Sequence, residues 1–416
     1  MSPIGTPGNY AATASEASVH GVGDGTVGIG LIGTGFMGQA HSYAWATVSK
    51  FFSVGSAPSL VVVAGRDRAT TASFRRRNGW QRDSLDWRAV VEAPDVDIVD
   101  ICVPSDQHVQ IVKAALDAGK HVLCEKPLAN SLSEAMTLLP VSDRATARGV
   151  HSMVGFNYRR LPAIALARQI VEAGELGTIR QIRGTYLQDW LSDSSVPMQW
   201  RLRAEVAGSG ALGDLGSHLV DSIQHVTGLE VDRVSAVLRT FTTSRPVTPE
   251  PTAAGFGPIS EPVTVDDAAW LTTTFRDGDA ICSLDVSRVA KGRPNQLSFE
   301  IFGATASISF DSERLNELTV HGDSTARGSR RIQVLEMEDP YMAAWWGGSH
   351  PIGWDHSFIH QASDLLSAVR DDRAPEPGIR SACQVQAVLQ AAHVSHTSGG
   401  QWVAVDHVAQ RTGLSG

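Results

Sequence analysis

Apolar runs of strand length alternate with segments of helical period in the first part of the chain. The runs are Val27–Gly33, Ser59–Ala64, Asp97–Val103, Lys120–Cys124 and Val150–Val154. The helical segments between them include Ala69–Asn78 and His108–Ala118, and a glycine follows each of these two. Strands that alternate with helices indicate a parallel, doubly wound sheet. We therefore expect residues 27–157 to form an α/β domain of this kind.

The pattern changes to a period of two after about residue 158. Alternating segments cover Thr178–Asp189, Arg233–Phe241, Asp267–Phe275, Ala280–Val289, Gln296–Phe302, Ala306–Phe310 and Leu318–His321. This alternation predicts antiparallel strands with one buried face, in an α+β domain of residues 158–416. The stretch Thr243–Pro262 is predicted to be a long loop. Helices are predicted at Pro162–Ala173, Trp354–Arg370 and Arg380–Thr397, and the last two could pack back on the first domain.

Composition narrows the class of protein. Of the 416 residues, 42% are apolar and 19% charged, which is ordinary for a globular protein of this length. The formal net charge of −9 disfavours nucleic acid as a partner, because phosphate binding needs a basic face. The sequence lacks the apolar run of about 18 residues that predicts a membrane span. We expect a soluble protein of enzyme size, with no membrane partner.

The N-terminus and the cysteines bear on the compartment. Residues 1–26 are rich in Gly, Ala, Ser and Pro, without a basic start or an apolar core, so we expect a flexible extension rather than a secretion signal. The four cysteines (Cys102, Cys124, Cys282 and Cys383) are far apart in sequence. Buried, inert thiols are favoured over disulfides or a metal site. A cytoplasmic protein without a metal is the expectation.

A glycine-rich turn follows the first predicted strand. Gly33, Gly35 and Gly38 fit the pattern G-x-G-x-x-G at the point where a helix begins. The first glycine permits a tight turn, the second a close approach to a pyrophosphate, and the third close packing of helix on strand. The helix N-terminus then faces the phosphates. This context predicts a dinucleotide-binding Rossmann domain, with Phe36 and Met37 beside the cofactor.

The residues that follow the second strand are expected to bind the adenosine ribose of the cofactor. An acid at position 65 would hold both ribose hydroxyls and repel a 2′-phosphate, but Gly65 stands there. Arg66 could bind a 2′-phosphate or stack on adenine, or it could be a solvated surface charge, while Asp67 could still reach the ribose. The choice between NAD and NADP stays open on these residues.

Two further motifs carry groups suited to proton transfer. Glu125, Lys126 and Pro127 follow the fourth strand, at the edge of the sheet where ligands bind, and Lys126 could point at the nicotinamide–substrate junction. If the chain is helical from Asp214, then Asp214, His218 and Asp221 share one face. Alone they are more often a cap and a packed imidazole. Beside a lysine and a nicotinamide fold, acid/base catalysis is favoured, and His225 is interpreted as structural.

Four segments resemble, in the same order, the glucose–fructose oxidoreductase/inositol dehydrogenase (Gfo/Idh/MocA) family. They read VGIGLIGTGFMGQAH, CEKPLA, VGFNYRR and GALGDLGSHLVD, and the resemblance extends over about residues 27–405. It implies that Lys126, Asp214 and His218 form the catalytic set. It also implies that Pro104, His108 and Glu125 lie at the cofactor, and that a large open antiparallel sheet assembles a homodimer or homotetramer.

Within the family, the segment GTYLQDWLSDSSVPMQWR looks most like the branch of levoglucosan dehydrogenases and glucoside 3-dehydrogenases. That likeness makes Tyr158, Gln188, Trp190 and Trp200 candidates for substrate contacts, although both tryptophans could equally belong to the core. Aromatic faces cover the C–H patches of a sugar, and polar groups bind its hydroxyls. The branch favours NAD as cofactor despite Arg66. Gly65 and the pair Trp345–Trp346 depart from the family pattern.

The sequence therefore predicts an NAD(P)-dependent dehydrogenase that oxidises a secondary hydroxyl, at ring C3, of a sugar, anhydrosugar or glycoside. Three alternatives stay open. One is an inositol dehydrogenase. Another is an NAD-using glycosidase without net redox change, although such relatives usually lack the lysine that is present here as Lys126. The third is a nicotinamide-binding regulator without catalysis, which the presence of both Lys126 and His218 disfavours.

Overall fold

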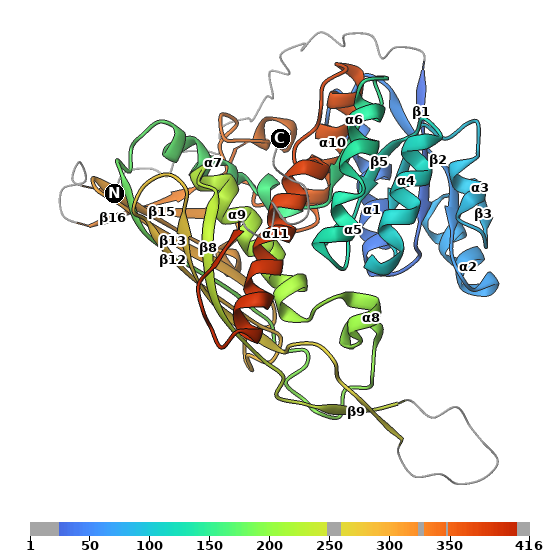
Figure 1. Ribbon diagram of the computed structural model, residues 1–416. Helices are drawn as coiled ribbons and strands as arrows, with labels where there is room; N and C mark the ends of the chain where they lie inside the picture. The colour runs from blue at the N-terminus through green and yellow to red at the C-terminus, as the bar shows by residue number, and fades with distance from the viewer. Residues whose placement is uncertain (1–24, 248–258, 323–327, 347, 406–416) are drawn as a thin grey trace, which may run out of the picture.

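A parallel six-stranded sheet forms the first part of the protein. The computed structural model describes residues 25–247, 259–322, 328–346 and 348–405, and Figure 1 shows the chain. The strands are β1 (Thr26–Ile32), β2 (Ala57–Ala64), β3 (Arg82–Ser84), β4 (Ile98–Ile101), β5 (His121–Cys124) and β6 (Ser152–Val154). Their spatial order is β3-β2-β1-β4-β5-β6, and every neighbouring pair is parallel. The predicted doubly wound sheet is confirmed.

Helices connect these strands, as the alternation of patterns predicted. They are α1 (Phe36–Thr47), α2 (Arg68–Asn78), α3 (Arg88–Val91), α4 (His108–Asp117), α5 (Leu132–Met136) and α6 (Leu139–Thr146). The ends of α2 illustrate the local causes. Asp67 caps its N-terminus by accepting a hydrogen bond from the amide of Thr70, and Gly79 ends it in the left-handed conformation with a φ of 78°.

A nine-stranded sheet forms the second part. Its strands in spatial order are β16 (Ser329–Gln333), β15 (Glu317–Gly322), β14 (Ala306–Asp311), β13 (Gln296–Gly303), β7 (Ile179–Leu187), β12 (Ile281–Ser287), β11 (Ala268–Phe275), β8 (Val231–Arg239) and β17 (Val403–Ala404). Within this second sheet, β7 and β12 are the only described neighbours that pair in parallel. The sheet is therefore mixed and mostly antiparallel, as expected. One consequence is that the C-terminal ends of β7 and β12 lie at the same edge as the N-terminal end of β13.

Helices cover one face of the second sheet. They are α7 (Pro162–Glu172), α9 (Ser217–Thr227) and α11 (Ile379–Thr397) (Figure 1). The short α8 (Ala204–Ala207) lies between α7 and α9 in the sequence. Both C-terminal helices contact the first part. The helix α10 (His356–Arg370) packs against α1, and α11 packs against β8 of the second sheet and also against α5 of the first part. No helix in the described ranges is both long and apolar enough to cross a membrane.

The predicted loop Thr243–Pro262 is partly wrong. Within it, β9 (Ser244–Pro246) and β10 (Ser260–Pro262) pair as a small antiparallel sheet, and residues 248–258 lie outside the described residues. Arg245 anchors β9 to a neighbouring segment, because its buried guanidinium donates hydrogen bonds to the carbonyl oxygens of Leu191 and Asp193 at 2.7 and 2.8 Å. The sequence pattern also missed β3, β16 and β17. These strands are short and lie at sheet edges, so a period of two is not visible in them.

Candidate active site

A cavity of about 820 Å³ extends from the first sheet to the second. On one side it is lined by the segments that follow β1, β2, β4 and β5, at the carboxyl edge where doubly wound sheets bind ligands. On the other side it is lined by the end of β7, the segment after β12 and the turn that precedes α9. The cavity therefore lies between the ligand-binding edge of the first sheet and polar side chains of the second part. We call these polar side chains the second polar wall.

The first part of the cavity fits a dinucleotide pyrophosphate. Gly33 has a φ of 117°, and a Cβ there would lie 2.3 Å from the carbonyl oxygen of Cys102. A Cβ on Gly38 would lie 2.1 Å from the carbonyl oxygen of Gly33, whereas a Cβ on Gly35 would meet only open space. The N-terminus of α1 begins at Phe36 and has no side-chain cap. Its amides are thus available to phosphate oxygens.

The structure places nearly all of the predicted cofactor residues around this cavity. Those that line it are Gly33, Gly35, Phe36, Met37, Arg66, Pro104, His108, Glu125 and Lys126. Gly38 does not line it, because it is buried and packs against the glycine turn. His108 contacts the carbonyl oxygens of Val103 and Pro127 at 3.0 and 2.8 Å, which ties two loops of the cavity together. Their contacts with a cofactor stay a prediction.

Lys126 and Asp214 meet across the cavity. The ammonium of Lys126 donates hydrogen bonds to the backbone carbonyl oxygen of Asp214 at 2.9 Å and to its Oδ1 at 3.0 Å. Burial by itself would raise the pKa of Asp214, but the positive charges of Lys126, Arg288 and Arg201 hold it below the usual range. The carboxylate is therefore ionised at neutral pH. It lies next to the amine that the sequence predicted to be catalytic.

A π-helical turn, η5 (Leu212–Gly216), carries Asp214 into the helix α9 that carries His218. Both residues line the cavity, as the motif predicted. Asp221 does not, because its carboxylate accepts two hydrogen bonds from Arg159 at 2.6 and 2.8 Å. Asp221, which the helical spacing placed on the same face as Asp214 and His218, is thus paired with Arg159 outside the cavity. His225, as interpreted from the sequence, is structural, since its Nδ1 contacts Arg168 at 2.8 Å.

The imidazole of His218 is enclosed by aromatic rings. Its centroid lies 5.0 Å from the ring of Tyr158, 6.0 Å from Phe156 and 6.1 Å from Tyr186. Its buried Nδ1 has no hydrogen-bond partner among the described residues. Burial, and then the charge of Lys126, lower the pKa of His218 well below its ordinary value. The imidazole is therefore neutral at neutral pH and able to accept a proton.

A chain of hydrogen bonds forms the second polar wall. The indole of Trp190 donates to the side-chain oxygen of Gln188 at 2.9 Å, and the amide nitrogen of Gln188 donates to Asn295 at 2.7 Å. The hydroxyls of Tyr158 and Tyr186 contact each other at 2.9 Å. The predicted substrate residues Tyr158, Gln188, Trp190 and Trp200 all line the cavity. Trp190 is also packed in a small apolar cluster, so it serves the core as well.

Sequence reasoning missed several cavity residues. They are Tyr186, Asn295, Arg288, Arg201 and Trp354. Arg288 is fully buried, and its guanidinium donates a hydrogen bond to the carbonyl oxygen of Asp266 at 2.9 Å. Trp354 stacks on Phe36 with a centroid distance of 5.8 Å. The alternation of β7 would have indicated that Tyr186 is buried, but no local signal shows that Asn295 and Arg288 reach the same edge.

Glu125 belongs to a buried network of charged groups in the first part of the protein. Nδ1 of His41 contacts both carboxylate oxygens of Asp100 at 2.9 Å, and its Nε2 contacts Oε1 of Glu125 at 3.1 Å. The indole of Trp45 donates to Asp100 at 2.7 Å. Burial alone would lower the pKa of His41, but the charge of Asp100 raises it well above the ordinary value. The imidazole is therefore a cation between two carboxylates.

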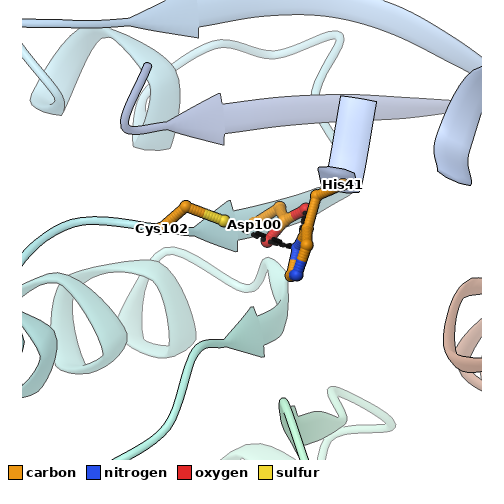
Figure 2. Close-up of side chains that lie close together, drawn as sticks. All are labelled: His41, Asp100 and Cys102. Carbon is orange, nitrogen blue, oxygen red and sulfur yellow. Dashed lines mark hydrogen bonds and ion pairs between the residues drawn. The ribbon is translucent and has the colours of Figure 1, made fainter. Parts of the chain in front are cut away.

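Three side chains close to one another in this network are of types that can bind a metal ion. The side-chain ligand atoms of His41, Asp100 and Cys102 lie within 4.8 Å of one another. Figure 2 shows these three side chains close together. However, Nδ1 of His41 is already in contact with Asp100, and a protonated imidazole cannot ligate a metal. Burial raises the pKa of the Cys102 thiol, which keeps it protonated. The geometry fits a hydrogen-bonded ion pair better than a metal centre.

Comparison with known proteins identifies the class to which this site belongs. Residues 27–156 match the family described as "Oxidoreductase family, NAD-binding Rossmann fold", and residues 164–309 match the "GFO/IDH/MocA C-terminal domain". The chain belongs to this family and is an NAD-dependent oxidoreductase, as the resemblance implied.

Two known proteins are similar over nearly their whole length. Levoglucosan dehydrogenase from Pseudarthrobacter phenanthrenivorans is 37% identical over 391 residues, which cover 92% of this chain and 98% of that protein. A solved structure of levoglucosan dehydrogenase with NADH and levoglucosan has a TM-score of 0.85 at 36% identity, covering 91% of this chain and 99% of that one. An oxidoreductase domain protein from Kribbella flavida has a TM-score of 0.87 at 45% identity, with coverage of 92% and 99%.

Replacing His41 tests the buried network. His41→Leu removes the cation and leaves two carboxylates buried without a charge partner, which typically costs about 3–5 kcal/mol. We expect a free energy of unfolding lower by that amount in urea titrations followed by circular dichroism. The double variant His41→Leu/Asp100→Leu should recover part of the loss, because one buried carboxylate is then removed. Equal stability of wild type and His41→Leu would show that the pair is not needed.

Proposed function

We propose that the protein oxidises a secondary hydroxyl, at ring C3, of an anhydrosugar or glycoside, with NAD as the hydride acceptor. The observation that carries this proposal is the meeting of Lys126, Asp214 and His218 in the cavity that continues from the glycine turn. Bound NAD supplies the electron-pair acceptor at the nicotinamide ring. The residues of the chain then have to position the hydroxyl and remove its proton.

Each of the three residues has a role that its surroundings support. The neutral imidazole of His218 accepts the hydroxyl proton while a hydride leaves the carbinol carbon, so the products are a ketone, reduced cofactor and one proton. The ammonium of Lys126 donates a hydrogen bond to the same oxygen and stabilises the negative charge that develops there. The carboxylate of Asp214 orients Lys126 through their 3.0 Å contact and is a second acceptor for substrate hydroxyls.

The walls of the cavity support a sugar-like substrate. Trp190 and Trp200 offer ring faces to C–H patches, while Gln188, Tyr158 and Asp214 offer hydrogen-bonding groups. The likeness to levoglucosan dehydrogenase in sequence and structure favours an anhydrosugar over an inositol. Oxidation at C3 rests on the resemblance of the segment around Trp190 to glucoside 3-dehydrogenases.

Assembly and compartment are further proposals. The helix-free face of the nine-stranded sheet exposes Val237 of β8, Trp270 of β11 and Ile281 of β12 by 40–45%, and Val237 and Trp270 are direct cross-strand neighbours. An exposed apolar strip of this kind favours a homodimer or homotetramer formed through the sheet. All four cysteines are free thiols, which is compatible with the reducing cytoplasm.

A panel of substrates tests the proposed function directly. Levoglucosan, methyl glucosides, free glucose and myo-inositol are each incubated with NAD, and reduced cofactor is followed by absorbance. We expect the highest kcat/KM for levoglucosan or a glucoside, with a 3-keto product identified by NMR. Bond cleavage without net NADH formation would show a glycosidase instead. A clear preference for myo-inositol would contradict the sugar assignment.

Substitutions test the roles of Lys126 and His218. Lys126→Ala and His218→Ala should each lower kcat by about 10²-fold or more, because general acid–base groups typically contribute that factor. The binding of NADH, followed by its fluorescence, should stay close to wild type. His225→Asn is the matched control, since this histidine lies on the same helix outside the cavity. Near wild-type turnover in both alanine variants would refute the catalytic assignment.

The pH profile tests the protonation state of His218. Burial and Lys126 lower its pKa below the ordinary value of 6.5. A base that acts in its neutral form loses activity only as the pH falls through its pKa. We therefore expect the acidic limb of kcat/KM to be centred below pH 6.5 in steady-state assays. An acidic limb centred above about pH 7 would contradict a neutral His218.

A further inference from the structure

The imidazole of His218 is oriented by ring contacts. A histidine base is ordinarily oriented by a hydrogen bond at its second nitrogen, but the buried Nδ1 of His218 has no such partner within the ranges that the structure describes. The shortest of its ring contacts is with Tyr158, whose centroid lies 5.0 Å away at an interplanar angle of 78°. A general base must point its free nitrogen at the substrate proton. The position of the Tyr158 ring therefore decides where the imidazole points.

Tyr158 is located by its neighbours in the sequence. It lies in the short 3₁₀ turn η3 (Asn157–Arg160), which packs against α7, α9 and α10. Asn157 donates a hydrogen bond to the hydroxyl of Ser357 on α10 at 2.8 Å, and Arg159 binds α9. The residues on both sides of Tyr158 thus hold the turn between two helices, and this fixes where the tyrosine ring meets His218.

Arg159 joins this turn to the helix that carries His218. Its Nε and Nη2 donate hydrogen bonds to the two carboxylate oxygens of Asp221 at 2.8 and 2.6 Å. Asp221 follows His218 by one helical turn on α9, and the side chains of Arg159 and Asp221 are only 13% and 1% exposed. A two-pronged contact of this kind fixes the orientation of both groups, and burial protects it from screening by salt. The ion pair therefore couples the position of Tyr158 to that of His218.

We propose that Arg159 and Asp221 are positioning residues for the proton transfer, and that they orient the imidazole of His218 through the ring of Tyr158. Neither Arg159 nor Asp221 lines the cavity, so neither is placed to contact a substrate. The inference rests on the proposed role of His218 as the base and deepens it. It concerns only residues of the chain itself, so it holds for whichever sugar the enzyme oxidises.

Asp221→Asn tests the ion pair in steady-state assays with the best substrate of the panel. We expect kcat to fall by about 10- to 100-fold, because a catalytic group displaced by about 1 Å loses up to that factor. KM should stay within about threefold, since the residues that line the cavity are unchanged.

The pH profile of Asp221→Asn supplies a second readout. The acidic limb of kcat/KM should move up towards pH 6.5, because water that reaches a loosened imidazole weakens the effect of burial on the pKa of His218. The charges that act on His218 come from Lys126 and Asp214, and the adjacent tyrosines stay neutral because burial raises the pKa of their hydroxyls. The shift therefore reports on packing and not on the lost carboxylate.

A double variant separates positioning from stability. Arg159→Met/Asp221→Leu replaces the buried ion pair by apolar side chains, a change that is often neutral for stability. We expect a free energy of unfolding in urea close to that of the wild type, with kcat as low as in Asp221→Asn. Asp364→Asn is the matched control, since it removes the carboxylate partner of Arg160 in the same turn. Arg160 still donates to the carbonyl oxygen of Glu376, so kcat should stay within about threefold.

Replacements of Tyr158 show whether its ring transmits the effect. Tyr158→Leu removes the ring and should lower kcat and raise the acidic limb, as Asp221→Asn does. Tyr158→Phe keeps the ring and loses the hydroxyl, so its main effect should be a higher KM. Equal losses of kcat in Tyr158→Phe and Tyr158→Leu would contradict a role for the ring.

The proposal would be overturned if Asp221→Asn kept the kcat of the wild type, or if the double variant recovered kcat together with stability. A loss in Asp364→Asn equal to that in Asp221→Asn would also overturn it. If Asp221→Asn does not fold, the double variant decides in the same way. A loss of turnover in His218→Ala without one in Asp221→Asn would refute the positioning role alone, whereas near wild-type turnover in His218→Ala would refute the base itself.

Discussion

The contact between Lys126 and Asp214 joins the two halves of the active site. Lys126 follows β5 of the parallel sheet, whereas Asp214 lies in the turn η5 of the second part. Their charged groups are nevertheless only 3.0 Å apart. The pair keeps Asp214 ionised and holds the ammonium at the point where the nucleotide edge meets the second polar wall. Because η5 leads directly into α9, the same contact also fixes where His218 enters the cavity.

The first sheet supports this contact through the residue that precedes Lys126 in the sequence. Glu125, the neighbour of Lys126, contacts Nε2 of His41 at 3.1 Å. His41 in turn contacts Asp100 on β4, as Figure 2 shows. Burying such a network of ions costs desolvation free energy, and it is tolerated only when the hydrogen bonds of the charged groups are satisfied. We interpret it as a rigid base that limits the movement of the loop after β5. Precise placement of a catalytic side chain depends on support of this kind.

The sequence predicted those features that depend on local pattern. Apolar runs separated by helical segments identified β1, β2, β4, β5 and β6. The glycine spacing identified the turn in which a Cβ at Gly33 or Gly38 would lie too close to a backbone carbonyl oxygen. The motif residues Lys126, Asp214 and His218 were found because each lies in a short, recognisable segment. For Asp221, the shared helical face did not reveal that Arg159 reaches it from another segment.

The second polar wall could not be predicted, because it depends on the order of strands in the sheet. Tyr186 lies next to the last residue of β7, Arg288 follows β12 and Asn295 precedes β13. These positions are adjacent only because β7 lies between the other two strands. Arg288 also resembles a solvated charge in the sequence. Its burial becomes understandable only when the carbonyl oxygen of Asp266 and the carboxylate of Asp214 are seen beside it.

The most direct measurement is a crystal structure of the protein with reduced cofactor and levoglucosan. The account predicts that the C3 hydroxyl lies within about 3 Å of both the ammonium of Lys126 and a ring nitrogen of His218, with the C3 hydrogen facing the nicotinamide. A complex in which a different hydroxyl occupies that position would contradict the choice of C3. A complex in which neither side chain contacts the reacting hydroxyl would contradict the account as a whole.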